Sequence, residues 1–97
     1  MAKKIKWSAR ARKERFEILE YWSNRNKSKR YSSKLNQLFL DNIELLTQTP
    51  HIGKPTHITD LRVIIVRDYL FYYQVQSSFI EVITIWDPRR DLSKFRL

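Results

Sequence analysis

The pattern of hydrophobic and polar residues changes its period near residue 61, which divides the chain into a helical part and an extended part. Residues 4–7 alternate between lysine and a large apolar residue, the period of a short half-buried strand. Ser8 is a suitable N-cap for a helix that runs to about Arg25. The apolar residues of this helix fall on one stripe, at Ala11, Ile18, Leu19 and Trp22.

A short polar break, residues 24–28, separates this helix from a second one, which Ser28 is placed to cap. Its apolar positions share a face: Tyr31, Leu35, Leu38, Phe39, Ile43 and Leu46. Pro50 marks its end, because proline cannot continue a helix. Two helices joined by so short a connection are expected to pack antiparallel. Residues 50–60 hold the only glycine and two of the three prolines, which predicts an ordered loop.

Three apolar runs follow, at 61–67, 69–75 and 79–86, separated by Asp68 and by Ser77 and Ser78. They predict a three-strand antiparallel meander. The runs are apolar on both faces, which predicts that both faces of the sheet are covered at least in part, although a helical hairpin can cover only one. We therefore predict one α+β domain over residues 1–97, with an antiparallel helical hairpin packed on a twisted antiparallel sheet in the order β-α-α-β-β-β.

Composition and charge narrow the function classes. The 97 residues carry a net charge of +9, and residues 1–30 alone hold 11 basic and 3 acidic residues, a field that attracts polyanions. The absence of cysteine excludes disulfides and thiolate metal sites and fits a reducing compartment. One glycine leaves no room for a glycine-rich phosphate loop, so we expect no cofactor. No signal peptide or long apolar run is present, so we expect a soluble, cytoplasmic protein with no membrane partner.

Metal binding has little support in the sequence. His51 and His57, the only histidines, lie six residues apart in the expected loop, with Asp60 nearby. Zinc sites usually take their ligands at regular spacing from defined elements. We therefore predict no metal site.

Aromatic and basic side chains interleave in the second half of the chain, the combination that stacks on unpaired bases and holds phosphates. Arg89 and Arg90 are candidate phosphate clamps, flanked by Asp87 and Asp91, which can instead simply compensate them. Further nucleic-acid contacts are predicted at Lys54, Tyr69, Tyr72, Arg90, Lys94 and Arg96. The alternative is that most of these aromatic residues belong to the core or to a protein interface.

Several segments, taken in order, resemble the RelE/ParE superfamily of toxins from bacterial type II toxin–antitoxin systems, also known as plasmid stabilisation proteins. They are Trp7-Ser8 before Ala11, Tyr21-Trp22, the loop 50–55, Leu61-Arg62, the segment 68–73 and the segment 85–90 (IWDPRR). The resemblance implies a compact toxin in a hetero-oligomer with a cognate antitoxin, whose acidic, flexible segment wraps and neutralises it. The +9 charge suits such a partner.

The resemblance leaves two targets open. RelE-like members cut ribosome-bound mRNA, whereas ParE-like members poison DNA gyrase without known catalysis. The tail arginine of the nucleases matches Arg89, but their tail tyrosine falls on Phe95, which lacks a hydroxyl. Their arginine after the tyrosine of the third strand falls on Leu70.

The paired basic residues of the nucleases fall near Val63 and Ile65, one step from Arg62 and Arg67. If this chain is a ribosome-dependent mRNA interferase, we expect it to hold phosphates with Arg62, Arg67 and Arg89 and to use His57 or Asp87 as the base. A different class also remains open, a non-toxic, small basic nucleic-acid-binding module or a decayed toxin.

Overall fold

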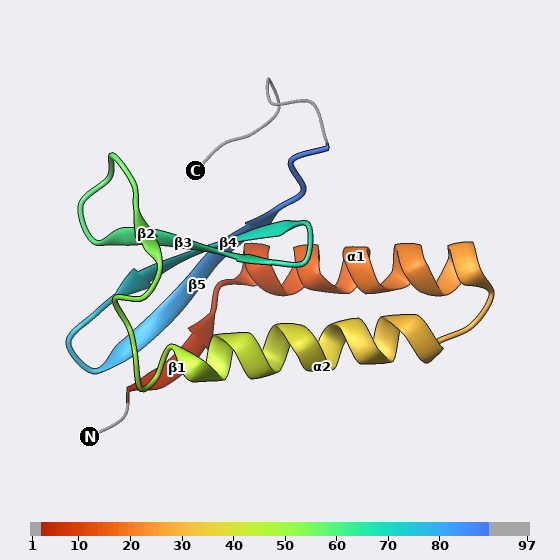
Figure 1. Ribbon diagram of the computed structural model, residues 1–97, viewed down its shortest axis with the longest axis horizontal. Helices are drawn as coiled ribbons and strands as arrows, with labels where there is room; N and C mark the ends of the chain where they lie inside the picture. The colour runs from red at the N-terminus through yellow and green to blue at the C-terminus, as the bar shows by residue number, and fades with distance from the viewer. Residues whose placement is uncertain (1–2, 90–97) are drawn as a thin grey trace.

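Two antiparallel helices lie side by side against one face of a five-stranded sheet and extend beyond it (Figure 1). The computed structural model describes residues 3–89. Its elements are β1 (Lys4–Trp7), α1 (Ala9–Asn26), α2 (Arg30–Leu45), β2 (Lys54–Pro55), β3 (Leu61–Val66), β4 (Tyr69–Val75) and β5 (Phe79–Trp86). The predicted α+β fold and its order β-α-α-β-β-β are confirmed, and β2 is a short addition.

The sheet has the strand order β1-β5-β4-β3-β2 and is mixed, where the sequence predicted an antiparallel one. β1 runs parallel to β5, with Ile5 opposite Ile80, and the other neighbours are antiparallel. The helical hairpin carries the chain from β1 to the far edge of the sheet. The β3–β4 and β4–β5 hairpins then bring it back, so that β5 arrives beside β1 in the same direction.

Helix α1 begins as predicted at Ser8, whose hydroxyl accepts a 2.9 Å hydrogen bond from the backbone N–H of Ala11. The same hydroxyl donates to the carbonyl of Ile83 on β5, which fixes the start of the helix to the sheet. The C-cap of α1 is Lys27, which takes the left-handed conformation (φ 49°) that glycine more often provides. Neither helix of the described residues 3–89 is long and apolar enough to span a bilayer.

Helix α2 starts and stops differently from the prediction. Its N-cap is Lys29, without a side-chain cap, while the predicted Ser28 accepts a hydrogen bond from the N–H of Arg30 at 3.2 Å. The helix ends at Leu45, and the hydrogen bond from Thr49 N–H to the Leu45 carbonyl continues the turn toward Pro50. The proline therefore lies beyond a frayed last turn.

The core lies between the helices and alternate residues of the central strand. Tyr69, Phe71 and Tyr73 of β4 are at most 4% exposed and belong to one buried cluster with both helices. The ring of Phe39 on α2 packs edge-on against Phe71, with 4.9 Å between ring centroids. Since strand side chains alternate, these aromatic residues point to the helices and their neighbours point away.

The opposite face of the sheet is also apolar, but the helices do not cover it. Val63 lies across from Tyr72 and Ile65 across from Leu70 on this face, and Ile65 is 69% exposed. Ile65 is therefore uncovered, whereas Leu70 and Tyr72 on the same face are half-buried, in line with the predicted partial cover. Within the described residues, the helical layer shields one face only.

Candidate functional site

A tight turn after β5 holds Asp87 and Arg89 in an ion pair. Asp87 accepts hydrogen bonds from the Arg89 backbone N–H at 3.0 Å and from its guanidinium Nε and Nη2 at 2.9 and 3.0 Å. The hydrogen bond to Asp87 raises the pKa of Arg89, so this guanidinium stays charged. The turn therefore holds an ion pair in which Asp87 compensates the charge of Arg89. The sequence analysis gave this as one of two interpretations.

Tyr69 links that turn to both helices. Its hydroxyl accepts hydrogen bonds from Trp22 Nε1 at 2.9 Å and from Arg89 Nη2 at 3.4 Å, and its ring packs edge-on against Phe39. The Arg89 guanidinium lies over the Tyr69 ring, 5.7 Å from its centroid. Tyr69 is 4% exposed, so its predicted stacking on a base is contradicted, because β4 alternation turns it to the core.

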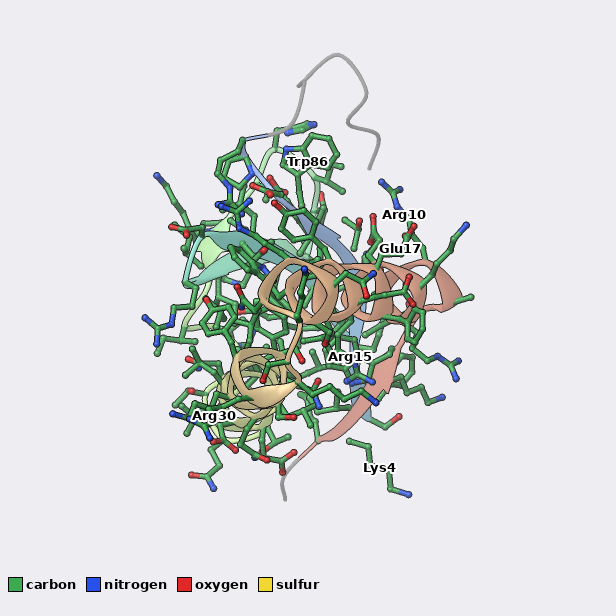
Figure 2. The ribbon with its side chains drawn as sticks, turned by 90° about the vertical axis from the view of Figure 1, so that its right-hand side faces the viewer. Lys4, Arg10, Arg15, Glu17, Arg30 and Trp86 are labelled. Atoms are coloured by element: carbon green, nitrogen blue, oxygen red, sulfur yellow. The ribbon has the colours of Figure 1, made fainter. Side chains whose placement is uncertain are left out.

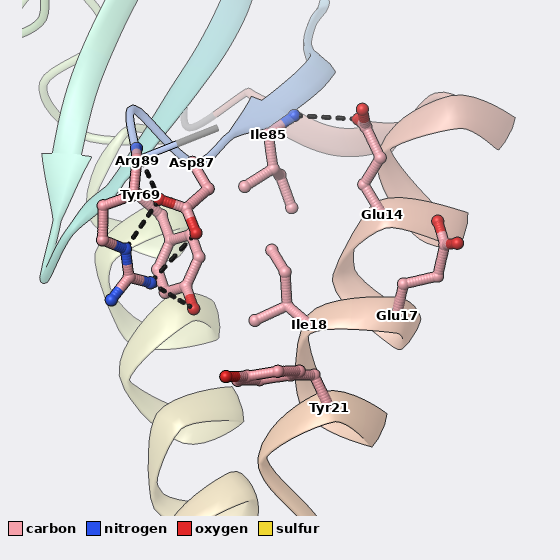
Figure 3. A pocket seen from close by; sticks show the side chains of 8 residues that line it. All are labelled: Glu14, Glu17, Ile18, Tyr21, Tyr69, Ile85, Asp87 and Arg89. Carbon is pink, nitrogen blue, oxygen red and sulfur yellow. Dashed lines mark hydrogen bonds and ion pairs between the residues drawn. The ribbon is translucent and has the colours of Figure 1, made fainter. Parts of the chain in front are cut away.

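A pocket of about 390 Å³ lies between α1 and this turn (Figure 3). We call it the α1 pocket, and it is lined by Glu14, Glu17, Ile18, Tyr21, Tyr69, Ile85, Asp87 and Arg89. Residues three, four and seven positions apart share a helix face, which places Glu17, Ile18 and Tyr21 beside Glu14. That spacing in an otherwise basic helix is a sequence signal for the pocket, and our sequence analysis missed it.

The other end of the sheet holds Arg62. Its Nη1 donates to the carbonyls of His51 and Gly53 at 3.2 and 2.7 Å, so it clamps the loop before β2 onto β3. β2 itself lies in the segment predicted to be a loop and pairs Pro55 with Arg62. The Arg62 guanidinium is thus hydrogen-bonded to two backbone carbonyls.

Tyr73 of β4 also holds this loop in place. Its hydroxyl donates to the Pro50 carbonyl and accepts from the Gly53 N–H, both at 2.9 Å. A Cβ at Gly53 would lie 2.7 Å from Cε1 of the Tyr73 ring, which explains the only glycine of the chain. Burial raises the pKa of Tyr73, while the Gly53 hydrogen bond and the Arg62 charge oppose that rise.

The structure divides the predicted catalytic residues between the two ends of β3. Arg62 is the second residue of the strand, and exposed His57 lies in the preceding turn. Arg67 follows the strand, in the β3–β4 turn with φ 58°, at the end where Asp87 and Arg89 lie. A six-residue strand rises about 3.3 Å per residue, so its ends are about 16 Å apart.

Two of the predicted nucleic-acid contacts in the described part of the chain, Lys54 and Tyr72, lie on the same face of the sheet, away from the helices. Exposed Lys54 on β2 is opposite Val63 of β3, and Val63 is opposite half-buried Tyr72 of β4. Burial raises the pKa of the Tyr72 hydroxyl. Arg90, Lys94 and Arg96 lie outside the described residues. Among residues 3–89, no group of three His, Asp or Glu side chains is placed to hold a metal.

Arg15, half-buried within the apolar stripe of α1, lies with its guanidinium 4.5 Å from the centre of the Trp7 ring. Burial, and then the charge of Arg12, lower the pKa of Arg15. Figure 2 shows Lys4, Arg10 and Arg30 pointing away from the fold, in keeping with their exposure. The basic first third of the chain therefore forms a largely solvent-facing surface.

Known proteins resemble the chain in sequence and in fold. Residues 5–92 match the family described as the ParE toxin of the type II toxin–antitoxin system parDE. A solved structure, described as the chromosomal ParDE toxin–antitoxin system from P. aeruginosa, superposes with a TM-score of 0.75 at 16% identity. The match covers 87% of this chain and 94% of the other, and it establishes the fold. Among proteins with curated descriptions, none matches.

Proposed function

Because the chain belongs to the ParE toxin family of type II toxin–antitoxin systems, we propose that it inhibits growth by binding DNA gyrase and not by cutting mRNA. The observation that carries this proposal is the separation of Arg62 and His57 from Arg67, Asp87 and Arg89 along β3. General acid–base catalysis needs its groups within hydrogen-bond reach of one reacting site. The backbone positions of Arg62 and Arg67 lie about 16 Å apart, which disfavours joint action of the two ends of β3 on a single phosphodiester.

The hydrogen bonds of the candidate residues support the same proposal. Arg62 is bonded to two carbonyls, and Asp87, the candidate base, is ion-paired with Arg89. An exposed guanidinium on a rigid turn suits a protein interface, where arginine is among the residues that contribute most to binding. We assign Arg89 this role at the target.

A cognate antitoxin is the second partner that we propose, in a hetero-oligomer that neutralises the toxin in the cytoplasm. The net charge of +9 favours an acidic chain, because charge complementarity speeds association. β1 lies at one edge of the sheet and leaves a strand edge open to pairing within the described residues. An acidic, extended segment fits both features.

Two parallel reactions with the purified chain test the target. We expect gyrase to lose supercoiling activity in one, and mRNA to keep its original 5′ ends in a translation reaction with ribosomes. Ribosome-dependent cuts with normal supercoiling would establish an mRNA interferase and overturn the proposal. No effect in either reaction, together with harmless overexpression, would favour the non-toxic binding module or the decayed toxin.

A further inference from the structure

Arg15 on α1 is a half-buried cation that makes no hydrogen bond or ion pair within residues 3–89. Its guanidinium lies against the Trp7 ring of β1, and Figure 2 shows the side chain between α1 and that strand. Burial, and then the charge of Arg12, lower the pKa of Arg15, as expected of a cation with no opposite charge nearby. Burying part of a charge is costly unless a partner neutralises it. Arg15 is therefore suited to bind an anionic group of a partner.

The backbone of β1 offers hydrogen bonds beside this guanidinium. Lys4 and Ser8 both donate their backbone N–H groups to carbonyls on the β5 side, at 3.4 and 3.0 Å. Backbone groups of successive strand residues point to opposite sides, so those of Ile5 and Trp7 point to the open edge of the sheet. A partner chain that extends the sheet would therefore hydrogen-bond to Ile5 and Trp7, next to Arg15.

We propose that Arg15 binds a carboxylate side chain of an extended, acidic partner segment paired with the outer edge of β1, at the residue directly opposite Trp7. Trp7 faces the helices, because its ring packs edge-on against Phe71 with 6.4 Å between centroids. Residues directly opposite each other on paired strands project to the same face, with Cβ atoms about 4.5–5.5 Å apart. The opposing side chain therefore lies on the face that holds Arg15. This inference rests on the acidic partner proposed above, and it adds the recognising residue and the register.

The other face of the same edge favours the same partner. Lys4 and Lys6 are exposed there, and Lys6 Nζ lies 4.2 Å from the centre of the Phe79 ring. Acidic residues at the alternate positions of the partner strand would meet these lysines. A second copy of this chain, with β1 paired to β1, would instead bring lysines together, and lysine on an edge strand opposes such pairing. A nucleic acid could neutralise the charges, but it lacks the peptide N–H and C=O groups that extend a sheet.

A synthetic peptide of about eight residues, a usual strand length, in which glutamate alternates with threonine, is the probe for this site. Its affinity for the full chain is measured by NMR titration. Arg15→Gln should weaken binding about tenfold, since hydrogen bonds to charged groups are among the stronger ones. The matched control is Arg30→Gln, the same loss of charge at an exposed position of α2, and it should weaken binding about twofold or less. Equal losses in the two variants, or no binding by the parent chain, would overturn the proposal.

Amide hydrogen exchange of the same complex tests the pairing itself. The amides of Ile5 and Trp7 should exchange more slowly when the peptide is bound, while that of Ser8, already bonded on the β5 side, should change little. Arg15→Lys keeps the charge without the planar fork, so it should bind with intermediate affinity if the variant melts with the parent. Unchanged exchange at Ile5 and Trp7 would show that the peptide does not extend the sheet. Neither measurement involves gyrase or mRNA, so either result leaves the proposed target to be decided separately.

Discussion

The carboxylate of Glu14 on α1 accepts a 2.7 Å hydrogen bond from the hydroxyl of Thr84 on β5, 70 residues further along the chain. The same oxygen accepts the Ile85 N–H at 3.0 Å. β1 pairs with β5 only as far as Val82, so the edge of β5 has no strand neighbour beyond that point on this side. Glu14 and the Ser8 hydroxyl replace the missing strand there.

Glu14→Ala should therefore destabilise the fold by about 2 to 4 kcal/mol, because two donors lose their acceptor and each costs about 1–3 kcal/mol when buried. Urea unfolding of the purified variant measures this loss. Glu20→Ala, an exposed change on the same helix, is the control and should stay within about 0.5 kcal/mol of the parent. A Glu14 variant as stable as the control would contradict this account of the β5 edge.

Stability should fall in alkaline solution because of Tyr73. Its hydroxyl is neutral when protonated, and burial raises its folded pKa above the unfolded value of about 10. The stabilising contribution is therefore present below about pH 10 and is lost as the pH rises through the folded pKa. Tyr72, also raised by burial, acts in the same direction. Urea midpoints measured at about pH 8 and about pH 11 record the loss.

Tyr73→Phe should be less stable at neutral pH by about 1 to 3 kcal/mol, since it leaves the Pro50 carbonyl and the Gly53 N–H without their partner. It should also lose less stability in alkali than the parent. Tyr21→Phe, at an exposed position, provides the comparison. An alkaline loss that is identical in parent and Tyr73→Phe would assign the effect to other groups.

Arg62→Leu should destabilise the protein by about 1 to 2 kcal/mol, because the loop before β2 loses the charged donor to its two carbonyls. Arg67→Asn should change stability little, since asparagine also tolerates the positive φ of this turn. Thermal unfolding of the two variants compares the ends of β3. If Arg62→Leu melts with the parent, the guanidinium does not hold the loop.

Arg89→Ala should abolish growth arrest and leave the fold intact, because the Arg89 side chain is 53% exposed and its ion pair contributes about 1 kcal/mol or less. Growth after induction and the melting temperature of the purified variant give the two readouts. Lys34→Ala on exposed α2 is the matched control. Full growth arrest by a folded Arg89→Ala would remove Arg89 from the target interface.

The sequence was sufficient for most of the fold, because its periodicity reports which face of each element is buried. Helix α1 and the three long strands fall where the pattern predicts. The parallel pairing of β1 was not predictable, since four alternating residues indicate a strand but not its neighbour or direction. Likewise, Ser28 is a good cap by residue type, but the chain turns one residue later, at Lys29.

The candidate site was harder to predict, because residues of the same type, close together in the sequence, have different surroundings in the fold. Arg62 and Arg67 are five positions apart and look interchangeable, yet one binds loop carbonyls and the other occupies a strained turn. Tyr69 was predicted to contact nucleic acid, and only the register of β4 shows that it faces the core. The α1 pocket joins α1 to the turn after β5, about 70 residues further along the chain, so the residue spacing on α1 indicates only one of its walls.

The most direct test of the central claim is a titration of the purified chain against a fixed amount of gyrase, with ribosomes and mRNA present. A protein that acts by binding should reduce supercoiling in proportion to the ratio of chain to gyrase, up to saturation, and leave the mRNA intact. Cut mRNA that accumulates with time at far less than one chain per ribosome would reveal catalytic turnover. That result would contradict the account, since it requires a working nuclease site.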